Sequence, residues 1–71
     1  MLMVKDIKEG DILVLTKAYP LYNPYYPVGE RFVFTGISIQ CGYRTLLRVH
    51  DTHKKESKLA YIPLIYFKKE I

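Results

Sequence analysis

The sequence predicts an all-β fold, namely a small barrel of five strands. Two observations point to it: short runs of β-branched, leucine and aromatic residues recur along the chain, and turn residues such as glycine and proline separate them. An open sheet of this size would leave exposed edges and no adequate core, which favours a closed or nearly closed barrel. The length of 71 residues fits a single domain covering residues 1–71.

The first half of the chain is expected to contain two strands and a long loop. Residues 12–16 form an apolar run that is too short for a helix and follows the turn signal Gly10-Asp11, so they predict the first strand. Residues 18–29 contain three prolines, which remove amide donors from a regular ladder and predict an ordered loop. Residues 31–37 alternate with period two, which predicts a second strand with both phenylalanines on one face.

The second half is expected to contain three strands. Residues 40–43 predict a turn with Gly42 at positive φ, and residues 43–50 predict the third strand. In that strand one face would carry Thr45, Leu47 and Val49, and the other Arg44, Leu46, Arg48 and His50. A polar connection over 51–57 leads to the fourth strand at 59–62. Pro63 then starts one short 3-10 turn through 64–66, before a last strand at 67–71.

Two segments resemble SH3 domains. Residues 7–15 look like the lysine-glycine-aspartate-isoleucine segment that enters a strand in that family, and residues 61–67 resemble its closing signature. The resemblance implies an SH3-like small barrel in which Pro63 and Tyr66 line a peptide groove. The family's first motif and its tryptophan are absent, and Ile65 stands where asparagine is usual. The chain is at least as similar to the SH3-like barrels of prokaryotes and their viruses, which often bind nucleic acid or a protein partner.

The positive charge is concentrated in the second half of the chain. The net charge is +4; residues 1–43 carry four bases and four acids, whereas residues 44–71 carry seven bases and three acids. A basic region of this kind attracts polyanions or acidic protein surfaces. Ordinary lysines that keep the protein soluble would give the same pattern.

Two groups of residues are candidates for binding a partner. The loop after the first strand carries aromatic rings that give contact area at a low cost in side-chain entropy: Tyr19, Tyr22, Tyr25 and Tyr26. These rings could stack on bases, or two or three of them could cover the barrel as part of its core. A basic strand face and the loop after it could contact phosphates through Arg44, Arg48, His50, Lys54, Lys55 and Lys58.

Enzymatic and metal-binding functions are not supported by the sequence. His50 and His53 resemble a ligand pair, but a metal site needs three or four convergent donors, and Cys41 is the only other soft candidate. We therefore expect no catalytic residues, no metal and no cofactor. The lone cysteine, the lack of a secretory signal at the start of the chain and the lack of a long apolar run predict a cytoplasmic protein without a membrane partner.

The sequence thus predicts a non-catalytic binding module. The first hypothesis is nucleic-acid binding through the basic strand face and the tyrosine-rich loop. The alternative is an SH3-like adaptor or inhibitor that binds an acidic or proline-rich protein surface and is encoded by a virus or mobile element. A monomer or a weak homodimer is expected, since small barrels often associate through exposed edges.

Overall fold

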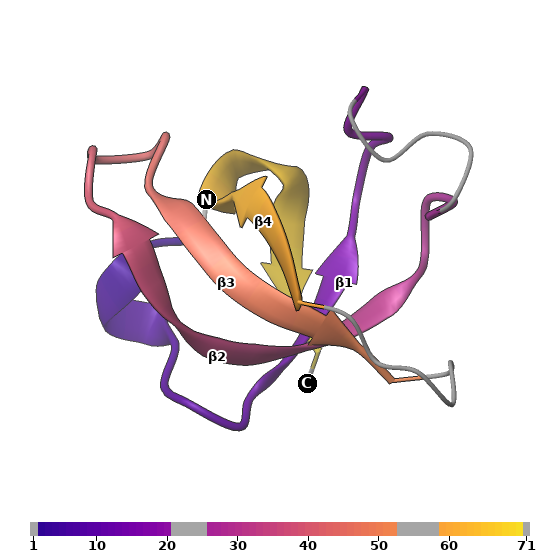
Figure 1. Cartoon of the computed structure of the whole chain (residues 1–71), viewed down its shortest axis with the longest axis horizontal. Coiled ribbons are helices and arrows are strands. Elements are labelled where there is room, and N and C mark those ends of the chain that lie inside the picture. The colour runs from indigo at the N-terminus through magenta and orange to yellow at the C-terminus, as the bar shows by residue number, and fades with distance from the viewer. Residues whose placement is uncertain (1, 21–25, 53–58, 71) are drawn as a thin grey trace.

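The computed structural model describes residues 2–20, 26–52 and 59–70. Over these residues five antiparallel strands form one sheet in the order β4-β3-β2-β1-β5 (Figure 1). The strands are β1 (Ile12–Leu15), β2 (Arg31–Ile39), β3 (Leu46–Asp51), β4 (Leu59–Pro63) and β5 (Phe67–Lys69), and the 3-10 turns are η1 (Val4–Asp6) and η2 (Leu64–Tyr66). The predictions of an all-β fold and of a 3-10 turn before the last strand are confirmed, and the described residues contain no α-helix.

The sheet is open, so the expected closure of a barrel is not found. In the described residues β4 pairs with β3 and β5 pairs with β1, and no ladder joins β4 to β5. The two edge strands follow one another along the chain, and η2 turns the backbone between them. β5 is only three residues long and pairs with β1 along one of its edges, and in the described residues η2 is the connection between β5 and β4.

Several strand boundaries and one turn differ from the sequence-based expectation, and the largest shift is the start of β3. Strand β2 runs two residues further, to Ile39, and β3 begins at Leu46 because residues 41–45 form a turn. The η1 turn was not predicted. It is three residues long and gives no apolar period, and it is held by the main-chain N–H of Met3, which donates to the Asp6 carboxylate at 3.0 Å.

The inward face of the bent sheet forms the core. The ring of Phe32 packs edge-on against Tyr26 and Phe67, with centroids 5.0 and 5.6 Å apart. The predicted alternation in β2 and β3 is confirmed, since Phe32, Phe34, Leu47 and Val49 are all buried. The buried apolar side chains are Leu13, Leu15, Tyr26, Phe32, Phe34, Leu47, Val49, Ala60, Ile62, Leu64 and Phe67.

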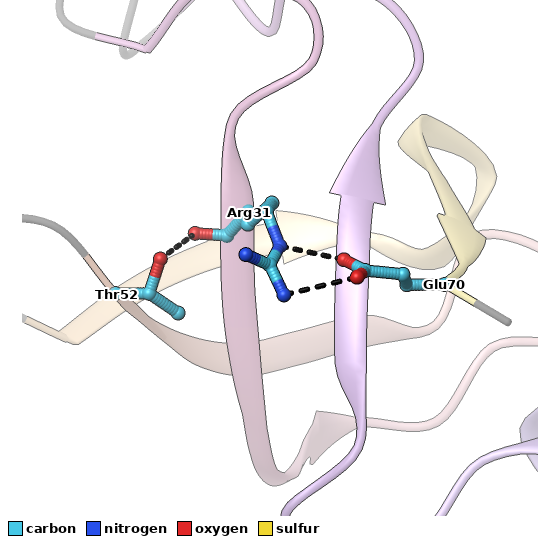
Figure 2. A network of polar contacts seen from close by, with 3 residues as sticks. All are labelled: Arg31, Thr52 and Glu70. Carbon is cyan, nitrogen blue, oxygen red and sulfur yellow. Dashed lines mark hydrogen bonds and ion pairs between the residues drawn. The ribbon is translucent and has the colours of Figure 1, made fainter.

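One ion pair spans three strands of the sheet. Arg31 on β2 donates from Nε and Nη2 to the two carboxylate oxygens of Glu70, at 2.6 and 2.9 Å (Figure 2). The side chain reaches past β1, which pairs with β2 on one side and with β5 on the other. Exposed pairs contribute at most about 1 kcal/mol, but two-pronged geometry is the favourable case. The contact therefore helps to hold the short β5 in place.

A bulge at Gly36 bends β2 across the sheet. The pairing of β2 with β3 shifts between Phe34 and Gly36, and Gly36 has φ +155°. Arg48 on β3 covers this point: its Nε donates to Thr35 Oγ1 at 3.1 Å and its Nη2 to the Thr35 carbonyl at 3.2 Å. A Cβ at position 36 would lie 3.0 Å from Nη2 of Arg48. Glycine is thus required by the backbone and favoured by the covering side chain.

Asp11 ties the start of β1 to the N-terminal segment and to β5. Its carboxylate accepts the main-chain N–H of Lys8 at 3.0 Å and lies 3.4 Å from Nζ of Lys69. The pKa of Asp11 is lowered from its ordinary value of 3.8, mainly by the hydrogen bond from the Lys8 backbone and further by the Lys69 charge. A lowered pKa in the folded state means that the ionised carboxylate stabilises the fold.

We expect Ile62→Val to lower the free energy of unfolding by about 0.5–1.5 kcal/mol, because one buried carbon is removed from a side chain that is 0% exposed. The matched change Ile39→Val, at a side chain that is 62% exposed, should alter it by less than about 0.5 kcal/mol. Urea unfolding followed by circular dichroism measures both values. Equal losses in the two variants would contradict the placement of Ile62 in the core.

We expect Gly36→Ala to cost about 1–3 kcal/mol of stability, because alanine is strained at this φ and its Cβ meets Arg48. The cost should be smaller, but not zero, when the same change is made in an Arg48→Ala background, which removes the contact and keeps the strain. Urea unfolding of the two single variants and the double variant measures this coupling. A cost of Gly36→Ala that is unchanged by Arg48→Ala would show that the guanidinium contact has no energetic role.

We expect Asp11→Asn to reduce the stability at neutral pH and to leave it nearly unchanged at about pH 2. The stabilisation from the ionised carboxylate is present above the ordinary pKa of 3.8 and is lost as the pH falls through the lowered folded-state value. Urea unfolding at a series of pH values measures the difference between the two proteins. A difference that grows toward low pH would have the wrong sign for this assignment.

Candidate binding groove

A groove of ≈ 460 Å³ lies where η2 meets the loop after β1 and the turn before β3. Its volume falls in the range of small ligand sites, about 300–1,000 Å³. We call it the aromatic groove, and it is lined by Lys17, Tyr19, Tyr43, Arg44, Pro63, Ile65 and Tyr66. Three segments far apart in the sequence thus contribute to one surface.

The first wall of the groove is formed by Lys17 and Tyr19 in the loop after β1, and hydrogen bonds from Thr16 attach this loop to η2. The N–H and the hydroxyl of Thr16 both donate to the carbonyl of Tyr66, at 2.8 and 3.0 Å. Three residues further on, the ring of Tyr19 packs edge-on against the ring of Tyr66, with centroids 4.8 Å apart. Both tyrosines are half-buried. The rings therefore have fixed positions and still present surface to a ligand.

The second wall is the turn between β2 and β3. The hydroxyl of Thr45, which is fully buried, accepts the N–H of Cys41 at 3.0 Å and donates to the carbonyl of Gly42 at 2.6 Å. Gly42 has φ +55°, as predicted, and the turn leaves Tyr43 and Arg44 exposed at its end. The N–H of Leu64 donates to the carbonyl of Thr45 at 2.8 Å, which joins this wall to η2.

The charge of the aromatic groove is positive. Nζ of Lys17 lies 5.0 Å from the ring centroid of Tyr66, and Cζ of Arg44 lies 5.7 Å from that of Tyr43. Both are cation–π contacts, which hold the cations beside the rings without neutralising them. No carboxylate lines the described groove. It therefore favours a ligand with flat or extended apolar groups and negative charge.

Four of the predicted binding residues meet in this groove: Tyr19, Arg44, Pro63 and Tyr66. Two of them come from the candidate nucleic-acid surface and two from the predicted peptide groove. The sequence-based expectation had treated these as separate surfaces. The fold brings them together because η2 lies between the two loops.

Two of the residues predicted to contact phosphates lie elsewhere. Arg48 and His50 are on β3, on the face opposite the buried Leu47 and Val49, and neither lines the aromatic groove. The Arg48 guanidinium is held against Thr35, and Nδ1 of His50 lies 3.3 Å from the main-chain oxygen of Asp51. The basic strand face and the groove are thus distinct in the described structure.

The tyrosines of the loop after β1 do not form one surface in the described residues. Tyr26 is only 8% exposed and packs on Phe32, so it belongs to the core. This agrees with the alternative that some of the loop tyrosines are part of the core. Tyr19 is at the groove. The remaining candidates lie outside the described residues: Tyr22, Tyr25, Lys54, Lys55 and Lys58.

Three lining residues were not among the predicted site residues: Lys17, Tyr43 and Ile65. Tyr43 immediately precedes Arg44 at the end of the glycine turn. An aromatic residue next to a basic residue in a turn is a sequence signal that could have identified it as a candidate binding residue. Ile65 lies between the two predicted groove residues Pro63 and Tyr66. Lys17 gives no such signal, because its place depends on the path of the loop after β1.

The described residues do not indicate metal chemistry or a membrane span. They contain no group of three His, Cys, Asp or Glu side chains that could hold a metal ion, and Cys41 is an exposed free thiol. No helix in the described ranges has the length and apolar character needed to cross a bilayer.

Comparison of the chain with protein-family models, with curated proteins and with solved structures gives no match. The function must therefore be inferred from the groove itself.

Proposed function

We propose that this domain is a non-catalytic binding module that holds an extended, acidic segment of a partner protein in the aromatic groove. The observation that carries the proposal is the convergence of three tyrosines, a proline and two cations from three separate segments. Rings of this kind bind extended chains and proline side chains, because they offer flat apolar area with few rotatable bonds. Lys17 and Arg44 add attraction for carboxylates.

A protein segment is favoured over nucleic acid by the distribution of the cations. Binding of a single strand needs positive side chains that follow a backbone over several nucleotides, together with rings on which bases stack. Among the described cations of the basic strand face, Arg48 lies outside the groove and its guanidinium is bound to Thr35, so this face does not continue the groove. A local site with two cations suits a short acidic segment better.

The proposed mode of binding agrees with the SH3-like character inferred from the sequence. In that interpretation Pro63 and Tyr66 would line a peptide groove. Tyr19 and Lys17, from the loop after β1, line the same groove here. The positive lining favours acidic proline-containing segments. An SH3-like fold remains our proposal for the type of domain.

The test measures the binding of short labelled peptides rich in proline, aspartate and glutamate by fluorescence anisotropy. We expect Arg44→Gln to weaken binding about five- to tenfold, because the groove loses one of its two cations. Tyr66→Ala should weaken it at least as much, since it removes a ring of the groove wall. Binding should also decrease as salt is added.

Arg48→Gln is the matched control, because it removes an arginine of β3 that does not line the groove and should change the affinity by less than about twofold. An oligothymidylate of equal charge is titrated in parallel. Two results would overturn the proposal: acidic peptides that do not bind, or an oligonucleotide that binds more tightly and loses affinity equally in both arginine variants. The second result would favour the basic strand face and nucleic acid.

A further inference from the structure

A second hollow, of ≈ 590 Å³, lies between the N-terminal segment and the turn before β3. We call it the apolar pocket, and it is lined by Leu2, Met3, Val4, Lys5, Gln40, Gly42, Tyr43, Thr45 and Leu64. It is distinct from the aromatic groove, but Tyr43 lines both hollows. This shared residue makes them neighbours on the surface.

The apolar pocket has a buried floor and an exposed apolar rim. Leu64 is 2% exposed and Thr45 is fully buried, and the half-buried Leu2 and Val4 pack against the core beside them. Met3 and Tyr43 remain more than half exposed at the rim. Exposed apolar side chains around a concave site are typical of a place where a partner inserts an apolar group.

Hydrogen bonds within the chain hold the N-terminal wall of the apolar pocket. The N–H of Asp6 donates to the carbonyl of Met3 at 2.9 Å, and the carboxylate of Asp6 accepts the N–H of Met3. Lys69 on β5 donates from Nζ to the carbonyl of Asp6 at 3.1 Å, which attaches the N-terminal turn to the sheet. A preformed site lowers the entropic cost of binding.

The charges around both hollows indicate what occupies them. Lys5 is the only charged residue that lines the described apolar pocket, and Lys17 and Arg44 are the charged residues of the aromatic groove. All three are cations. A ligand that places an apolar group in the apolar pocket and acidic groups in the aromatic groove would complement both hollows.

We propose that the apolar pocket receives one large apolar side chain, such as phenylalanine or leucine, from the same acidic segment that lies in the aromatic groove. This inference rests on the proposed function and narrows it: the ligand is an acidic segment with a single apolar anchor. The chain of the ligand would pass over Tyr43, which lines both sites. Anchors of this kind dominate the affinity of small interfaces.

The experiment compares a series of acidic proline-containing peptides, each with one phenylalanine at a different position, with the same peptides carrying serine there. We expect the best phenylalanine peptide to bind about tenfold more tightly than its serine counterpart, because its ring is removed from water in the pocket. Val4→Thr, which keeps the shape and adds a hydroxyl to the pocket wall, should reduce this ratio to about threefold or less. Met3→Ala provides a second variant at the exposed rim and should also lower the ratio.

Val28→Thr is the matched control, since Val28 is 59% exposed and lines neither hollow, and it should leave the ratio unchanged. Arg44→Gln should weaken both peptides equally and also preserve the ratio. Equal binding of phenylalanine and serine peptides would overturn the proposed apolar anchor. A ratio that neither Val4→Thr nor Met3→Ala changes would also overturn it. Both results would leave the proposed function standing. Binding of neither peptide would overturn the anchor and the proposed function together.

Discussion

The position of η2 is the constraint on which the rest of the structure depends. This turn connects the two edge strands of an open sheet, and its main chain bonds to both neighbouring segments: the carbonyl of Tyr66 accepts two bonds from Thr16, and the N–H of Leu64 donates to Thr45. These contacts hold the start of one loop and the end of another beside the turn. Both hollows include residues of η2, so its displacement would open them together.

Much of the fold could be predicted from the sequence because its strands have clear local signals. Period-two alternation identified the inward-facing phenylalanines of β2, and Pro63 identified the start of η2. Features set by side-chain bonds were harder to predict. The late start of β3 depends on the hydroxyl of Thr45, and η1 depends on the carboxylate of Asp6. The open edge was missed because turn spacing does not say whether the last strand pairs with its predecessor.

The candidate site was predicted in fragments. Tyrosine, arginine, proline and a second tyrosine were each singled out by residue type, but their convergence depends on contacts between segments more than fifteen residues apart. Sequence reasoning also grouped Arg44 with Arg48 because they fall on the same face of an extended strand. The turn that ends at Thr45 breaks that strand, and so the two arginines separate: one faces the groove, and the other covers the bulge at Gly36.

The aromatic groove also has a spectroscopic consequence. The chain contains seven tyrosines and no tryptophan, and Tyr19, Tyr43 and Tyr66 all line the groove. In the absence of an indole, excitation energy absorbed by these phenols is not passed to a stronger emitter. The intrinsic ultraviolet emission of the protein therefore comes from tyrosine alone, with three of its sources at the groove. An unlabelled domain thus carries its own reporter of what occupies that surface.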